Sequence, residues 1–159
     1  MKKIAVLGAG LVGAAVARDL ATAFDVTAVD RRAEDLGPTF AGTAVKVKAA
    51  DLSDADILRS VVAPFDLVVG ALPGHLGYEA LSAVIDAGKD VVDIAFFPED
   101  PFGLDERARE RGVTAVVDFG VAPGMCHVLL GHHVATMDAV HRFECLVGGL
   151  PVERRWPFE

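Results

Sequence analysis

A glycine-rich hexapeptide near the amino terminus constrains the fold of this chain more than any other feature. Gly8-Ala9-Gly10-Leu11-Val12-Gly13 follows a short apolar run, residues 4–7, and opens a longer amphipathic segment, residues 11–23. A strand, a turn with this glycine spacing and a helix, in that order, begin a βαβ unit. The first glycine permits a tight turn, the second lets the backbone approach a ligand, and the third lets the helix pack closely on the strand. The other interpretation is a glycine-rich turn that binds nothing.

The start of this helix is suited to an anion. Free amides in the first turn of a helix, together with the helix dipole, attract the pyrophosphate of a dinucleotide. We therefore predict that Gly8, Gly10, Leu11, Val12 and Gly13 contact such a cofactor.

An acidic residue indicates which dinucleotide the chain would bind. Asp30 lies 20 residues after Gly10, directly behind the apolar run 26–29. A carboxylate there accepts hydrogen bonds from both hydroxyls of the adenosine ribose and repels a 2′-phosphate, which favours NAD. Arg31 and Arg32 follow at once, and either could pair with a 2′-phosphate. NADP therefore stays open as the alternative cofactor, and Arg31 joins the predicted contacts.

Short β-branched runs alternate with amphipathic segments along most of the chain, which is typical of a parallel sheet covered by helices. The pattern predicts an α/β fold with a doubly wound, mostly parallel, six-stranded Rossmann sheet. The expected strands are 4–7, 26–29, 44–47, 66–69, 91–94 and 114–117, and the expected helices are 11–23, 32–36, 54–62, 75–87, 104–111 and 124–137. Ser53 is the expected N-cap of one helix. Leu11, Ala15, Val16 and Leu20 are the expected apolar face of the first helix.

Further candidate ligands follow the third and fourth strands, because these sheets bind ligands beyond the carboxyl ends of their strands. Asp51 and Leu52 are predicted to border the adenine, although Asp51 would equally suit a turn before Ser53. Ala71, Leu72 and Pro73 form a tight loop that we predict to line the pyrophosphate and the nicotinamide ribose, with plain turn chemistry as the alternative.

Asp93 ends the fifth strand and is the predicted catalytic residue, a carboxylate that would orient an amine or act as a base. Asp118, at the end of the sixth strand, is a weaker candidate. Either carboxylate could instead cap a loop by accepting hydrogen bonds from backbone amides.

The carboxyl-terminal part departs from this regular pattern. Residues 140–147 alternate as a further strand would, and residues 148–159 have no pattern that suggests a fold of their own. We expect an NAD(P)-binding Rossmann domain over residues 1–137. Residues 138–159 would form the first strand and linker of an incomplete substrate or dimerisation domain. On this interpretation the chain is a fragment or a truncated product, inactive by itself.

Charge and hydropathy exclude several classes of protein. The net charge of −8 argues against nucleic-acid binding, which needs a basic face. No uninterrupted apolar run reaches about 18 residues, so we expect no membrane span. The first 23 residues resemble a signal peptide, but their glycines, Arg18 and Asp19 interrupt the apolar region. A cytoplasmic location is expected.

The cysteines and histidines indicate no metal site. Cys126 and Cys145 lack zinc-ligand spacing and are expected to be reduced thiols. His127, His132 and His133 point to different sides of a helix, and no metal is predicted.

Several stretches together resemble the saccharopine dehydrogenase-like family, most closely its lysine 6-dehydrogenase branch. They run through nearly the whole chain, and the Val-Ala-Pro-Gly-Met and Gly-Gly-Leu-Pro stretches are the most particular. The resembling stretches are 6–13, 66–74, 87–94, 98–101, 118–125 and 148–151.

The resemblance implies an NAD(P)-linked oxidoreductase that takes an amino-acid amine as its small-molecule substrate and oxidises it by hydride transfer. It also implies a second α/β domain and a homodimer in the full-length family member. The chain departs from the family at Cys126-His127, where a pair such as Ser-Asn would be expected.

Two other functions compete with this one. A non-catalytic NAD-sensing regulatory domain would share the glycine motif and the acid, but it would not need the stretches 121–125 and 148–158. A flavin enzyme would usually interrupt the pattern with a β-meander after the second strand, and none is evident.

Overall fold

The computed structural model describes residues 1–148. The chain divides into two compact units, Met1–Gly120 and Val121–Glu159. Interpretations that concern residues 149–159, including most of the Gly-Gly-Leu-Pro stretch and the tail behind it, lie outside the described residues.

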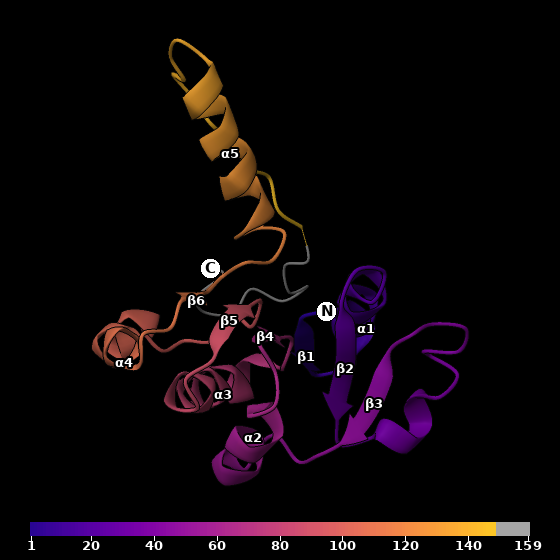
Figure 1. Cartoon of the computed structure of the whole chain (residues 1–159). Coiled ribbons are helices and arrows are strands. Elements are labelled where there is room, and N and C mark those ends of the chain that lie inside the picture. The colour runs from indigo at the N-terminus through magenta and orange to yellow at the C-terminus, as the bar shows by residue number, and fades with distance from the viewer. Residues whose placement is uncertain (149–159) are drawn as a thin grey trace, which may run out of the picture. The chain divides into compact units, whose positions relative to one another are not determined.

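The first unit is a six-stranded sheet in which every neighbouring pair of strands is parallel, in the order β3-β2-β1-β4-β5-β6. The predicted doubly wound Rossmann sheet is thereby confirmed. Figure 1 shows the strands β1 (Lys3–Leu7), β2 (Asp25–Asp30), β3 (Lys46–Ala49), β4 (Leu67–Gly70), β5 (Asp90–Asp93) and β6 (Ala115–Val116). Between them lie α1 (Leu11–Leu20), η1 (Ala33–Leu36), α2 (Ala55–Val62), α3 (Gly74–Asp86), η2 (Pro101–Leu104) and α4 (Asp105–Arg111).

The strand order reverses between β1 and β4, and this reversal positions the site. The chain winds outward from β1 to β3 and then returns to β4 on the other side of β1. Leu7, the last residue of β1, is the register partner of both Val29 and Gly70. Because parallel strands end at one edge, the loops that follow β1, β2 and β4 leave the sheet side by side, where ligands bind in such folds.

Most helix boundaries fall within one residue of the sequence expectation, and two of the differences have a clear physical cause. The N-cap of α2 is Asp54, whose carboxylate accepts hydrogen bonds from the amides of Asp56 and Ile57 at 2.9 and 3.1 Å. Ser53 was wrongly predicted there, because its own hydroxyl donates to Asp51 Oδ1 at 2.7 Å. The first helix ends at Leu20 rather than at Ala23. Residues 21–23 form tighter turns instead, in which the amides of Thr22 and Ala23 bond to carbonyls three residues earlier.

The buried face of α1 also differs from the prediction. Val16 and Leu20 are half-buried against the core, as predicted, but Leu11 is 96% exposed and Ala15 lies on the surface. The fully buried residues are Gly13, Ala14 and Ala17. Small residues face the sheet because the helix axis lies close to it, which leaves no room for larger side chains.

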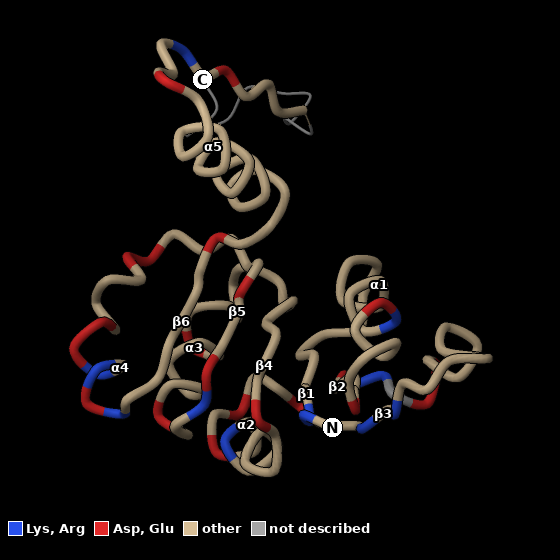
Figure 2. The backbone as a smooth tube through the Cα atoms, turned by 45° about the horizontal axis from the view of Figure 1, so that its top comes forward, with Lys and Arg blue, Asp and Glu red and all other residues tan. Residues whose placement is uncertain are grey.

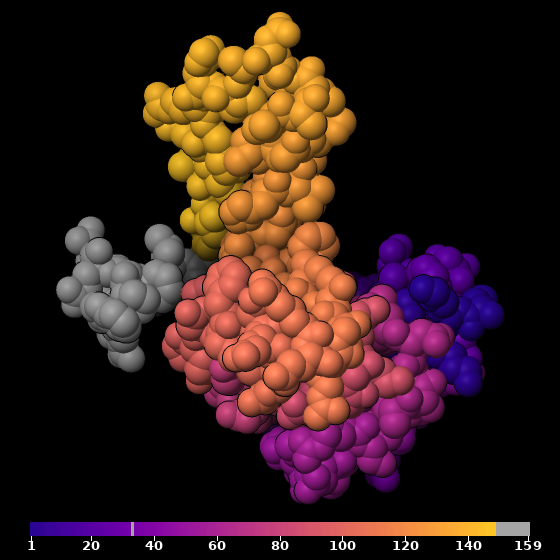
Figure 3. All heavy atoms as spheres, turned by 60° about the vertical axis from the view of Figure 1, so that its left-hand side comes forward, coloured from indigo at the N-terminus to yellow at the C-terminus, as the bar shows by residue number. Residues whose placement is uncertain are grey.

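The second unit contains one helix within its described residues, α5 (Met125–Thr136), close to the predicted 124–137. Figure 2 shows that α5 carries no charged residue, and none of its residues is buried. The segment that follows α5 in the sequence runs back beside the helix (Figures 1 and 3). Residues 140–147 form no strand, so that prediction was wrong. A strand needs a neighbouring strand to complete its backbone hydrogen bonds, and residues 121–148 contain no such strand.

Among residues 1–148, the helices are all too short or too polar to cross a bilayer.

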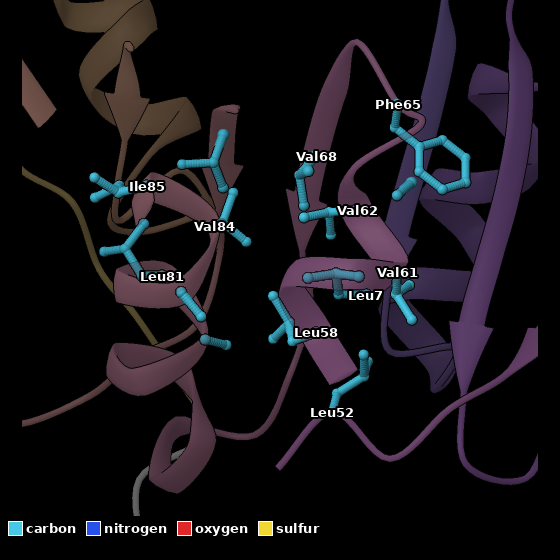
Figure 4. Close-up of a cluster of buried hydrophobic side chains, with 14 of the residues drawn as sticks. Leu7, Leu52, Leu58, Val61, Val62, Phe65, Val68, Leu81, Val84 and Ile85 are labelled. Carbon is cyan, nitrogen blue, oxygen red and sulfur yellow. The ribbon is translucent and has the colours of Figure 1, made fainter. Parts of the chain in front are cut away.

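The core of the first unit lies on both faces of the sheet. One cluster packs β1, β4 and β5 against α2 and α3, and Figure 4 shows Leu58, Val62 and Leu81 at its centre. The other cluster packs β1 and β2 against α1 and η1 through residues such as Val6, Ala17 and Phe40. Cover on both faces explains why the central strands β1 and β4 are nearly continuous apolar runs, whereas β3 at the edge of the sheet is exposed and carries two lysines.

Leu58→Ala tests the first cluster. Leu58 is 0% exposed, so its truncation should lower the free energy of unfolding by about 2–5 kcal/mol, through lost burial and the cavity left behind. Leu11→Ala is the matched control, since Leu11 is 96% exposed, and its effect should stay within about 0.5 kcal/mol. Urea denaturation measures both; equal losses would show that the helix packing is misassigned.

Candidate functional site

The glycine turn packs against its surroundings without space for side chains. Gly8 has a φ of +90°, and a Cβ on it would lie 2.6 Å from the Ala71 carbonyl oxygen. A Cβ on Gly13 would overlap the Gly8 carbonyl oxygen. Two of the three glycines are therefore required by the protein's own packing, as the motif predicted.

Gly10 differs, because an added Cβ would meet no protein atom within 4 Å. The residue is the N-cap of α1, and no side chain caps this end. The first backbone bond of the helix runs from the Ala14 amide to the Gly10 carbonyl at 2.9 Å. The amides of Leu11, Val12 and Gly13 therefore remain available to an anion above the helix.

Asp30 joins the end of β2 to the glycine turn. Its Oδ2 accepts a hydrogen bond from the Ala9 amide at 3.0 Å, and its Oδ1 accepts one from the Arg32 amide at 2.9 Å. Arg32 Nε lies 3.8 Å from Oδ1, and the Asp30 side chain is 14% exposed. Since a carboxylate has about four acceptor sites, these contacts orient Asp30 and still leave capacity for a ribose hydroxyl.

A cavity of about 670 Å³ lies over these residues, within the first unit. That volume falls within the usual range of small-molecule sites. Its lining comes from the ends of β1, β2, β3, β4 and β5 and from the starts of α1 and α3. The lining residues are Gly8, Gly10, Leu11, Val12, Gly13, Asp30, Arg31, Arg32, Ala50, Asp51, Leu52, Ser53, Ala71, Leu72, Pro73, His75, Leu76, Ile94, Ala95 and Phe96.

All twelve residues predicted to contact the cofactor line this one cavity. The contacts themselves stay predictions. Sequence reasoning missed Ile94, Ala95 and Phe96, which follow β5 in the same way that Ala71 follows β4. Their position after a strand was the available signal.

Asp93 is not among the lining residues. The side chain is 3% exposed and lies over Gly70, where a Cβ would overlap the carboxylate. Its Oδ1 accepts a hydrogen bond from the Ala95 amide at 2.5 Å. Asp93 is thus connected to the cavity through its hydrogen bond to Ala95, which lines the cavity. Its catalytic role stays a prediction.

Burial raises the pKa of Asp93 from 3.8 to about 6, an effect opposed by the Ala95 hydrogen bond and increased by the charge of Asp118. By contrast, Asp51 accepts hydrogen bonds from the Ser53 hydroxyl and amide, which lower the pKa of its carboxyl together with the charge of Arg31. Asp51 therefore forms the turn expected as an alternative and also lines the cavity.

Comparison with known proteins gives a family match over most of the first unit. The model of the family described as "Saccharopine dehydrogenase NADP binding domain" matches residues 4–116. Saccharopine dehydrogenase [NADP(+), L-glutamate-forming] of Pyricularia oryzae is 28% identical over 108 residues, 64% of this chain and 23% of that protein. The enzyme of the same name from Schizosaccharomyces pombe is 27% identical over 113 residues, 67% of this chain and 24% of that protein. The chain thus spans about a quarter of the length of these relatives.

A solved structure agrees in fold. Apo saccharopine dehydrogenase (L-Glu forming) from Saccharomyces cerevisiae matches with a TM-score of 0.76 and 22% identity, over 86% of this chain and 31% of that one.

The buried carboxyl of Asp93 predicts a pH dependence of stability. Between about pH 4 and pH 6 the folded chain keeps a proton on Asp93 that the unfolded chain has released, so this contribution to stability is present below about pH 4 and lost as the pH rises through about 6. Relative to Asp93→Asn, which keeps an oxygen for the Ala95 amide, the chain should lose about 2 kcal/mol of unfolding free energy from pH 4 to pH 7.

Urea denaturation of both proteins from pH 4 to pH 7 measures the difference in their unfolding free energies. The contributions of the other carboxyls are common to both proteins and cancel in this difference. A constant difference between the two proteins would contradict the pKa assigned to Asp93.

Proposed function

Because the chain belongs to the family of saccharopine dehydrogenase NADP-binding domains, we propose that it serves an oxidoreductase that oxidises an amino-acid amine by hydride transfer. The chain supplies the NAD(P)-binding part of such an enzyme. The observation that carries the proposal is the cavity at the carboxyl ends of the strands, with the glycine turn and Asp30 on its wall.

Each part of the cavity has a task in this proposal. The uncapped amides of α1 hold the pyrophosphate, and Gly10 lets it approach the backbone. Asp30, already oriented by the Ala9 amide, holds the adenosine ribose. When bound, NAD(P) would supply the hydride acceptor. The loop of residues 94–96 borders the part of the cavity farthest along the sheet from Asp30.

The loop after β5 is held in place from below. Asp93 binds the Ala95 amide, and Gly77 in α3 leaves room for Ala95 and Phe97, which a Cβ would approach to 2.7 Å. We propose that Asp93 contributes to the reaction by positioning this loop, since its side chain lies beneath the lining rather than in it.

The amine substrate is supported by the names of the relatives. Two of the similar proteins are saccharopine dehydrogenases that are named for NADP(+) and for forming L-glutamate. A substrate with an amino-acid amine follows for this chain by analogy. In an enzyme that joins this domain to a substrate-binding domain, lysine should drive formation of reduced cofactor. Asp93→Ala, which removes the acceptor for the Ala95 amide, should lower kcat more than Asp93→Asn, which keeps one. Cofactor binding with no turnover of any amino acid would favour the alternative, an NAD-sensing regulatory domain.

We further propose that the cavity prefers NAD(H) to NADP(H), although the family description names NADP. Asp30 supports this preference, because a carboxylate at the end of β2 repels a 2′-phosphate. The nearby cations are already engaged by acids: Arg32 lies beside Asp30, and the charge of Arg31 acts on Asp51.

Asp30→Asn tests the preference by removing the charge while keeping an acceptor for the Ala9 amide. The ratio of the NADH and NADPH dissociation constants should shift toward NADPH by about tenfold, or about 1.4 kcal/mol. Calorimetric titration of both cofactors measures the ratio. Asp35→Asn is the matched control, an exposed acid of η1 that does not line the cavity. Tighter NADPH binding by the unmodified chain would reverse the proposed preference.

A further inference from the structure

The first half of the loop after β5 is fixed to the sheet by hydrogen bonds. The Ile94 amide donates to the carbonyl of Gly70, the last residue of β4, at 3.0 Å. The next amide, that of Ala95, donates to the buried Asp93 carboxylate at 2.5 Å. The backbone that leads into Phe96 therefore cannot shift without breaking bonds to two strand ends.

The second half of the loop is fixed by close packing on α3. A Cβ on Gly74 would overlap the Phe96 carbonyl oxygen, and a Cβ on Gly77 would approach the Phe97 ring to 2.7 Å. The Phe97 ring also packs edge-on against Tyr78, with the ring centroids 5.7 Å apart and the planes at 71°. Phe97 thus anchors the loop on the helix, and the backbone of Phe96 is held on both sides.

The side chain of Phe96 is the part of this loop that stays uncovered. Phe96 is 73% exposed and lines the cavity, whereas Phe97 beside it is half-buried against the core. Three half-buried apolar residues, Leu72, Leu76 and Ile94, line the same end of the cavity. Apolar and aromatic side chains of this kind form the main contact surface of small-molecule sites. The loop therefore presents one aromatic ring, on a fixed backbone, to whatever occupies this end.

The other end of the cavity is charged. The acidic and basic lining residues, Asp30, Arg31, Arg32 and Asp51, all follow β2 or β3, and the lining residues that follow β4 and β5 include no Lys, Arg, Asp or Glu. The strand order β2-β1-β4-β5 puts the glycine turn between the two ends. A dinucleotide with its adenosine ribose on Asp30 and its pyrophosphate over α1 consequently extends its nicotinamide toward β5 and Phe96.

We propose that the Phe96 ring binds the nicotinamide and favours its oxidised form, a role that rests on the cofactor site proposed above. The oxidised nicotinamide is a planar cation, and the reduced nicotinamide is neutral. The face of an aromatic ring attracts a cation, so the oxidised form gains an electrostatic attraction in addition to the apolar contact that both forms make. Phe96 therefore holds the oxidised cofactor more tightly, and the reduced cofactor leaves the cavity more readily.

Calorimetric titration of the 159-residue chain with NAD+, NADH and ADP-ribose tests this role, or with their 2′-phosphorylated counterparts if these bind more tightly. ADP-ribose keeps the adenosine, the pyrophosphate and the second ribose but lacks the nicotinamide. Phe96→Leu keeps an apolar side chain and removes the aromatic face. This variant should raise the Kd for NAD+ by about fivefold and the Kd for NADH by less, and it should leave the Kd for ADP-ribose unchanged.

Two further variants are the controls. Phe96→Tyr keeps an aromatic face and should bind NAD+ as the unmodified chain does. Phe102→Leu is the matched control, because Phe102 is 81% exposed in η2 and does not line this cavity, and all three Kd values should stay unchanged. Both phenylalanines are exposed, so the variants should fold normally, which urea denaturation checks.

The outcomes separate the role of Phe96 from the cofactor site itself. If Phe96→Leu weakens NAD+ and NADH equally, weakens ADP-ribose as much as NAD+, or changes no Kd, the role of Phe96 is overturned while the cofactor site stands. If the unmodified chain binds none of these ligands, the cofactor site and the role of Phe96 are overturned together.

Discussion

The close contact between the start of α1 and the turn after β1 is the interaction on which the rest of the site depends. Gly13 lies against the Gly8 carbonyl, and Gly8 lies against the Ala71 carbonyl, in both cases with no room for a Cβ. These backbone atoms belong to the sheet edge and cannot retreat without displacing β1 or the loop after β4. The contact aims the amides of the first helical turn at the cavity. It also explains why α1 buries Ala14 and Ala17 rather than its larger side chains.

Acidic side chains hold the neighbouring loops in register with that turn. Asp30 binds the Ala9 amide, Asp51 binds Ser53, and Asp93 binds Ala95, so each of three strand ends is tied to the residues that follow it or to the turn beside it. Only Asp93 is buried, and burial raises its pKa. One type of residue thus lines the cavity where it is exposed and holds a loop beneath the lining where it is buried.

The second unit follows a different physical rule. Helix α5 carries no Lys, Arg, Asp or Glu and buries none of its residues, so hydrophobic packing does not hold it as it holds the sheet. At the start of the helix, His127 accepts a hydrogen bond from the Gly124 amide and contacts Cys126.

The sequence by itself determined the elements of the sheet and the residues at its carboxyl edge. Hydrophobic periodicity and glycine spacing are local properties, and a parallel sheet places every strand end on one edge, so all twelve predicted contacts line one cavity. The tertiary structure alone decided which face of α1 is buried and which cap begins α2. It also decided that Asp93 lies beneath the lining while residues 94–96 form part of it. These outcomes depend on how closely distant segments pack and on which hydrogen-bond donors lie near each side chain. Neither property can be inferred from a local sequence pattern.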